Sequence, residues 1–170
     1  MARKIVTYPH PVLAQTARPV EEITDEIRQL AAEMAQLMYE DKGIGLAAPQ
    51  VAESIRLITV DLSGPDKRED LQVFVNPVLT NLEGEVDSEE GCLSVPGYRS
   101  TVTRAERLHL SALDLDGNPV EMEADDLMAI CLQHEVDHLN GVLFIDKISK
   151  LKRTLYDRKV KKWLKQKKED

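Results

Sequence analysis

Two histidines and a glutamate in the last third of the chain have the spacing of a metal site. Residues 133–138 read Gln-His-Glu-Val-Asp-His, which places His134 and His138 four positions apart with Glu135 beside the first. Residues four apart lie one above the other on a helical face, so both imidazoles can reach one metal ion while the glutamate acts on water there. The pattern therefore predicts hydrolytic metal chemistry.

The alternative is a chance pattern on a solvated helix. It is weakened because Leu127, Ile130 and Cys131 fall on the same face as the two histidines. That face is the core side of a helix, where an unpaired polar group is costly. Cys131 lies one turn before the first histidine, and we interpret it as part of a cavity wall.

A catalytic metal site generally takes three protein ligands, so a third one is required. No histidine follows His138, and the later carboxylates lie in a connection or on a basic tail. Upstream, the segment Glu90-Gly91-Cys92-Leu93-Ser94 offers a thiol beside a glycine, which lets the backbone approach a ligand closely. Cys92 is the best candidate, and the alternative for it is a buried small apolar side chain.

A third segment, Gly-Ile-Gly-Leu-Ala-Ala-Pro-Gln at residues 43–50, combines small residues with a terminal amide. The small residues let the chain pass close beside another group, and Gln50 can donate a hydrogen bond. The alternative is a helix end followed by a tight turn, which explains the glycines without any ligand.

Hydrophobic periodicity predicts the elements that hold these segments. From Ile23 to Met38 the apolar positions recur at helical spacing, with acidic residues in the first turn and Gly43 just past the end. Residues 56–124 contain short strand-like runs, and Asp116-Gly117 is a hairpin turn signal between the last two. The runs are 57–60, 73–75, 108–115 and 120–123. The middle of the chain is therefore predicted to be mostly antiparallel sheet.

Two more helices follow. One runs from Asp125 or Asp126 to Asn140, carries the two histidines and stops at Gly141. The other begins near Lys147 or later and is basic. Its expected apolar stripe consists of Ile148, Leu151, Leu155, Val160, Trp163 and Leu164. The predicted class is α+β, with mostly antiparallel sheets packed around the metal-binding helix.

Composition limits the classes of function. The 170 residues suit one domain, contain no Gly/Ser-rich linker and no apolar run long enough to cross a membrane, and begin without a signal or transit pattern. We expect one catalytic domain, 1–170, located in the cytoplasm, with both cysteines reduced.

Residues 1–146 carry 11 Lys/Arg against 27 Asp/Glu, whereas 147–170 carry 11 against 3. The acidic body argues against nucleic-acid binding outside the basic tail.

The three motifs, in this order and at these separations, resemble the signature of the peptide deformylases, and the segment Tyr8-Pro-His-Pro-Val-Leu13 resembles the start of that family. The resemblance implies an enzyme that hydrolyses the N-formyl group from the formyl-methionine of new polypeptides and releases formate. It implies Cys92, His134 and His138 as metal ligands, Glu135 as general base and acid, and Gln50 with the backbone N–H of Leu93 facing the oxyanion. It also implies a substrate-binding set of Ile44, Gly45, Gly91, Arg99, Ile130 and Cys131.

Several points remain open in the sequence. The ligand set suits zinc on general grounds, whereas the resemblance suggests Fe(II), with zinc or nickel in protein handled in air. The tail, 147–170, is either a solvated surface helix or a contact with ribosomal RNA. We expect a monomer and no membrane contact. The competing functions are a His-Glu-x-x-His metallopeptidase and a non-catalytic, metal-stabilised RNA- or ribosome-binding protein.

Overall fold

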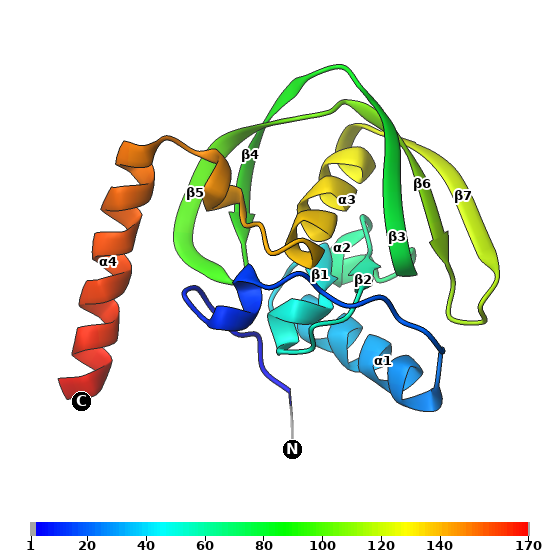
Figure 1. Ribbon diagram of the computed structural model, residues 1–170, viewed down its shortest axis with the longest axis horizontal. Coiled ribbons are helices and arrows are strands. Elements are labelled where there is room, and N and C mark those ends of the chain that lie inside the picture. Colours follow the sequence, from blue (N-terminus) through cyan, green and yellow to red (C-terminus); the bar gives the residue numbers. More distant parts are fainter. Residues whose placement is uncertain (1–2, 170) are drawn as a thin grey trace.

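The computed structural model describes residues 3–169, which form antiparallel sheets around a central helix (Figure 1). The elements in chain order are a 3-10 turn (Pro11–Ala14), α1 (Asp25–Glu40), β1 (Gly45–Ala47), a 3-10 turn (Ala48–Val51), β2 (Leu57–Val60), α2 (Gly64–Lys67), β3 (Gln72–Glu83), β4 (Val86–Cys92), β5 (Val95–Arg104), β6 (Arg107–Leu113), β7 (Pro119–Asp125), α3 (Asp126–Leu139), a 3-10 turn (Phe144–Lys147) and α4 (Lys150–Glu169). The predicted α+β class is confirmed. No helix within 3–169 is long and apolar enough to cross a membrane.

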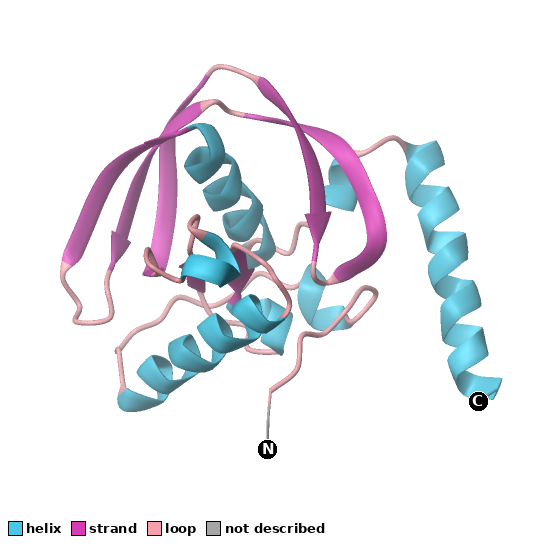
Figure 2. Ribbon diagram, turned by 180° about the vertical axis from the view of Figure 1, so that it is seen from behind, coloured by secondary structure: helices cyan, strands magenta, loops and turns pink. Residues whose placement is uncertain are grey.

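Two sheets surround α3. One has five antiparallel strands in the order β1-β2-β3-β6-β7, and the other pairs β4 with β5. The predicted hairpin turn connects β6 to β7, where Gly117 takes a positive φ and the Asp114 carboxylate accepts hydrogen bonds from the N–H groups of Asp116 and Asn118. Figure 2 shows the sheets arching over α3 while α1 lies on the opposite side of β1 and β2.

Strand β2 is buried on both faces because helices cover both. Ile58 and Val60 pack into a core with Leu132 and Val136 of α3. Leu57 packs on the other side, in a second core built on α1. All four residues of β2 are buried, as a continuous apolar run predicts for a strand covered on both sides.

Helix α3 begins and ends as its sequence predicts. It spans Asp126–Leu139, and Gly141 follows with a φ of +74°. A side chain there is excluded as well, because a Cβ on Gly141 would lie 2.6 Å from the carbonyl oxygen of Ala14. The helix stop therefore doubles as the place where the N-terminal segment crosses α3.

The expected apolar stripe of the last helix is wrong in part. Leu151, Leu155 and Leu164 are 70%, 52% and 43% exposed. Val160, Trp163 and Ile148 of the expected stripe do pack on the buried face, where Tyr156, which was not expected, joins them. The helix starts at Lys150, in agreement with the expected start near Lys147 or later, because Phe144–Lys147 forms a 3-10 turn and the Ser149 hydroxyl accepts a hydrogen bond from Lys152 N.

Candidate active site

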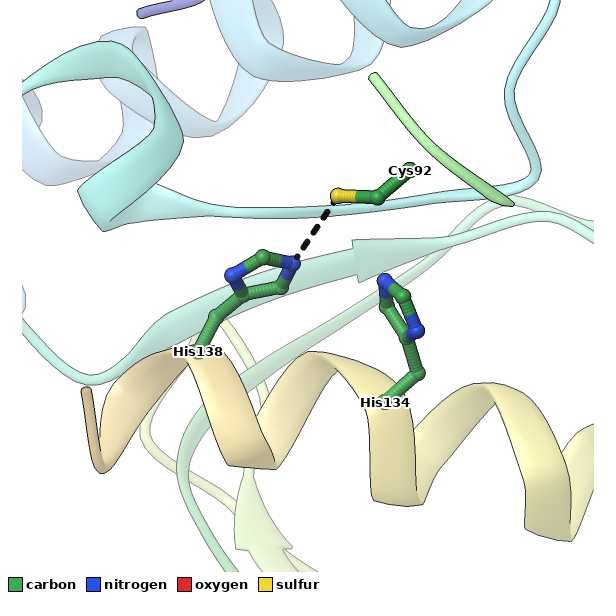
Figure 3. A group of neighbouring side chains, drawn as sticks. All are labelled: Cys92, His134 and His138. Atoms are coloured by element: carbon green, nitrogen blue, oxygen red, sulfur yellow. Dashed lines mark hydrogen bonds between the residues drawn. The ribbon is translucent and has the colours of Figure 1, made fainter. Parts of the chain in front are cut away.

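The histidines of α3 and the cysteine that ends β4 converge on one point (Figure 3). Cys92 Sγ and one ring nitrogen each from His134 and His138 all lie within 4.8 Å of one another, and Cys92 Sγ is 3.3 Å from His138 Nε2. A thiolate with two imidazoles is a ligand set for zinc or iron that leaves a position open for water or substrate. The three residues fit a divalent metal ion.

Glu90 fixes the orientation of His134. Its Oε1 lies 3.0 Å from His134 Nδ1, so the Nδ1–H group donates and the Nε2 lone pair stays available for a metal. Arg104 donates from Nη2 and Nε to the two oxygens of the same carboxylate at 2.7 and 2.8 Å, and from Nη1 to Asp137 at 2.6 Å. Burial acts to raise the pKa of the Glu90 carboxyl, but the hydrogen bonds from Arg104 and His134 bring it down to about 2.

Glu135 lies beside these ligands as a buried carboxyl. It is 4% exposed, and burial raises its pKa to about 7. Its Oε1 has no hydrogen-bond partner among the residues that the structure describes. A buried polar atom without a partner demands a ligand or a water molecule, and water held at the metal would supply one. The carboxyl can therefore exchange a proton near neutral pH, as a general base requires.

Gly45 of β1 is in tight contact with this carboxyl. A Cβ on Gly45 would lie 2.4 Å from Glu135 Oε2 and 2.9 Å from Cys131 Sγ. Any side chain there would displace the glutamate, so the glycine is required by close approach, as the sequence predicts. Burial also raises the pKa of the Cys131 thiol, which stays neutral as a wall of the cavity.

Gln50 is buried with its amide held in one orientation. Its Oε1 accepts a hydrogen bond from Ala47 N at 2.9 Å. Its Nε2 donates to Ser94 Oγ at 3.1 Å and lies 3.6 Å from Cys92 Sγ. The amide donor therefore points to the metal ligands, where it can meet a substrate oxygen.

A cavity of about 820 Å³ opens over the site. Its lining includes Ile44, Gly45, Gln50, Gly91, Cys92, Leu93, Arg99, Ile130, Cys131, His134 and Glu135. Of the twelve predicted site residues, only His138 is outside this lining, and it lies directly against Cys92. The structure brings all of them together, while their individual roles remain predictions.

Sequence reasoning missed several residues around the site. Glu90 lies in the segment 90–94, but no neighbouring residue in the sequence indicates that it contacts His134. Arg104 has no signal either, because the β4–β5 hairpin alone brings it near the site. Leu127 and the segment 95–98 also line the cavity. Asp137, next to the ligand His138, accepts a hydrogen bond from Arg104.

Comparison with known proteins decides the family. Residues 2–154 match the sequence model of the polypeptide deformylases. This chain belongs to the peptide deformylase family. The peptide deformylase of Acinetobacter baumannii is 50% identical over 163 residues, covering 95% of this chain and 92% of the relative. That of Alkalilimnicola ehrlichii is 47% identical, covering 95% and 90%.

Solved peptide deformylases share the fold. A crystal structure from Legionella pneumophila superposes with a TM-score of 0.90 at 44% identity, covering 100% of this chain and 99% of that one. A structure from Synechococcus elongatus in complex with actinonin gives 0.84 at 40% identity, covering 92% and 85%. The family resemblance stated from the three motifs is confirmed. As a peptide deformylase this chain is a hydrolase, and the alternatives of a metallopeptidase and a non-catalytic RNA-binding protein are set aside.

Proposed function

We propose that this chain hydrolyses the formyl group from the N-terminal formyl-methionine of new polypeptides, giving formate and a free amine. The observation that carries the proposal is the position of Glu135, whose unpartnered Oε1 lies beside the Cys92, His134 and His138 ligand set on a cavity wall. A metal-activated water and a proton-exchanging carboxyl together can hydrolyse a linear amide.

Each protein group has a defined task in this reaction. A divalent ion held by Cys92, His134 and His138 would polarise the formyl carbonyl and lower the pKa of water. Glu135 takes the proton from the attacking water at Oε1 and later returns it to the departing amine. Gln50 Nε2 and the backbone N–H of Leu93 donate hydrogen bonds to the oxygen that becomes negative.

The cavity lining supports the proposed substrate contacts. Gly45 and Gly91 present backbone groups that no side chain covers, so they are suited to hydrogen bonding with an extended peptide. Ile44 and Arg99 flank them. Ile130 and Cys131 on α3 offer apolar surface for an unbranched methionine side chain, together with the face of His134. We assign the methionine to this part of the lining.

The function is tested by comparing the reaction of the protein with a formylated and an acetylated form of the same peptide. The protein is expected to convert formyl-Met-Ala-Ser to Met-Ala-Ser and to leave acetyl-Met-Ala-Ser unchanged, because the acetyl methyl group crowds the reacting carbon. Mass spectrometry of both reactions also reports on internal amides, which should stay intact. Cleavage between methionine and alanine would overturn the proposal in favour of a peptidase.

We also propose Fe(II) as the native ion. Its support is the Cys-His-His ligand set together with the family resemblance, and both the thiolate and the iron are open to oxidation. Protein prepared without oxygen should contain iron in a one-to-one ratio and lose activity on exposure to air. Iron-free protein of equal activity from the same anaerobic preparation would contradict it.

We further propose that the chain acts as a monomer in the cytoplasm and contacts the ribosome through α4. The basic outer face of this helix supports the ribosome contact. Lys152, Lys159, Lys161, Lys162 and Lys165 are all exposed. A cluster of lysines on an acidic protein binds RNA in a salt-dependent manner. Cosedimentation with ribosomes should weaken as salt rises and should be lost in Lys159→Glu/Lys162→Glu. The control Lys67→Glu on α2 should bind as the wild type does, and equal binding by all three proteins would remove the proposal.

A further inference from the structure

Three residues of β5 form a bulge in the cavity wall. Gly91 of β4 pairs with Arg99, yet the next residue, Cys92, pairs with Val95, so that Pro96, Gly97 and Tyr98 have no partner on β4. All three bulge residues line the cavity, directly beside the metal ligand Cys92. A bulge interrupts the ladder of hydrogen bonds, so its conformation depends on what packs against it.

Helix α4 packs against this bulge from outside, along β5 (Figures 1 and 2). The Tyr156 hydroxyl donates to the carbonyl oxygen of Pro96 at 3.2 Å, and the Tyr156 and Tyr98 rings lie 5.0 Å apart. Tyr156 is 1% exposed, so the donor of this partly buried hydrogen bond lies in the interior.

Trp163 lies against the centre of the bulge. Gly97 has a φ of +73°, and a Cβ built on it would lie 3.2 Å from Trp163 Cη2. The indole therefore rests on the one residue of the bulge whose backbone conformation favours glycine. The absence of a side chain at Gly97 allows the helix to approach the backbone at this point.

The same contacts continue to the metal ligands. Tyr98 stacks on Phe144 with ring centroids 6.1 Å apart, and Phe144 stacks on His134 at 6.3 Å. Aromatic contacts thus run from α4 through the bulge to α3. The family match ends at residue 154, before both Tyr156 and Trp163, so this support comes from outside the matched region.

We propose that Tyr156 and Trp163 are positioning residues for substrate binding, which hold the Pro96–Tyr98 bulge in the conformation that lines the cavity. The proposal rests on the proposed deformylase function. Neither residue touches the reacting atoms. Their effect reaches the substrate through the bulge, so substrate binding should change more than the chemical step.

Steady-state kinetics with formyl-Met-Ala-Ser on the metal-loaded, full-length protein tests this inference. Trp163→Ala should raise KM several-fold and leave kcat unchanged, because the metal ligands and Glu135 stay in place. Trp163→Phe keeps an aromatic ring beside Gly97 but lacks the distal indole atoms that approach it, so it should restore part of the wild-type KM. Leu155→Ala, at a position 52% exposed on the same helix, is the matched control and should behave as the wild type.

Hydrogen exchange of residues 95–99 in the absence of substrate gives a second readout. Exchange should be faster in Trp163→Ala than in Leu155→Ala, and this comparison holds whether or not the wild type releases formate. Tyr156→Phe removes one hydroxyl without creating a cavity, and its exchange of residues 95–99 should be faster by a smaller amount. This variant provides the test if Trp163→Ala fails to fold. Unchanged KM and unchanged exchange in the folded variants would overturn the inference, as would a loss of kcat and metal without a change in KM.

Discussion

Glu90 accepts a hydrogen bond from His134 Nδ1 at 3.0 Å while Arg104 occupies both oxygens of the same carboxylate. This relationship ties a metal ligand on α3 to the β4–β5 hairpin that supplies the third ligand, Cys92. The pair is buried, since Glu90 is 6% and Arg104 is 4% exposed. The buried Glu90 charge is therefore balanced by Arg104, with a further hydrogen bond from His134.

Arg104→Met should lower stability and metal affinity together. It leaves the Glu90 charge buried without its partner, which costs about 3–5 kcal/mol of unfolding free energy. A histidine whose supporting carboxylate is disturbed typically binds its metal about 10–100-fold more weakly. Denaturant unfolding and chelator competition measure the two effects. Arg107→Met, whose side chain is 54% exposed, is the control and should change neither, and wild-type behaviour of Arg104→Met would contradict the role of the pair.

Glu135→Gln should remove catalysis and keep the metal. The amide has nearly the shape of the carboxyl but cannot take a proton, so kcat should fall by at least about 10²–10⁴-fold. Metal content by elemental analysis should match that of the wild type. The exposed Glu123→Gln serves as control. A variant with wild-type kcat would exclude Glu135 as the general base.

Gln50→Ala should lower kcat by about 10²–10³-fold, the usual effect of removing one oxyanion donor. The side chain also bonds Ala47 N and Ser94 Oγ, so a thermal melt must accompany the kinetics. Gln36→Ala on the surface of α1 is the matched control. Unchanged kcat in a folded Gln50→Ala protein would show that its amide does not face the developing charge.

His109 should make stability depend on pH. The ring nitrogens lie 2.5 Å from carboxylate oxygens of Glu123 and Glu121, and these hydrogen bonds raise the pKa of the imidazole above its ordinary 6.5. A raised folded pKa contributes stability that is complete below the unfolded pKa and is lost as pH rises through the folded value. The stability advantage of the wild type over His109→Gln should therefore shrink from about pH 6.5 upward. A difference that stays constant with pH, measured by denaturant unfolding, would refute this.

Much of the site follows from sequence because its signals are local. His134 and His138 share one helical face by their spacing alone, and the small residues at 43–48 mark a close approach that Gly45 makes to Glu135. The boundaries of α3 also follow from local signals at its two ends. Such features need no knowledge of distant partners.

What the sequence did not predict depends on partners far along the chain. Arg104 and Glu90 meet only through the register of β4 and β5, two strands in which polar residues and a bulge obscure the alternation. The buried face of α4 is set by aromatic contacts with Tyr98 and Gly97, so Tyr156 is buried while Leu151 is exposed. Periodicity alone does not show which of two faces finds a partner.

The central claim is that Cys92, His134 and His138 hold a metal with which Glu135 hydrolyses a formyl amide. The most direct measurement is formate release from formyl-Met-Ala-Ser by anaerobic, Fe(II)-loaded protein, with metal content determined on the same samples of wild type, Cys92→Ala and Glu135→Ala. We predict rapid release by the wild type, loss of both metal and activity in Cys92→Ala, and loss of activity alone in Glu135→Ala. A folded, metal-replete wild type that releases no formate would contradict the account.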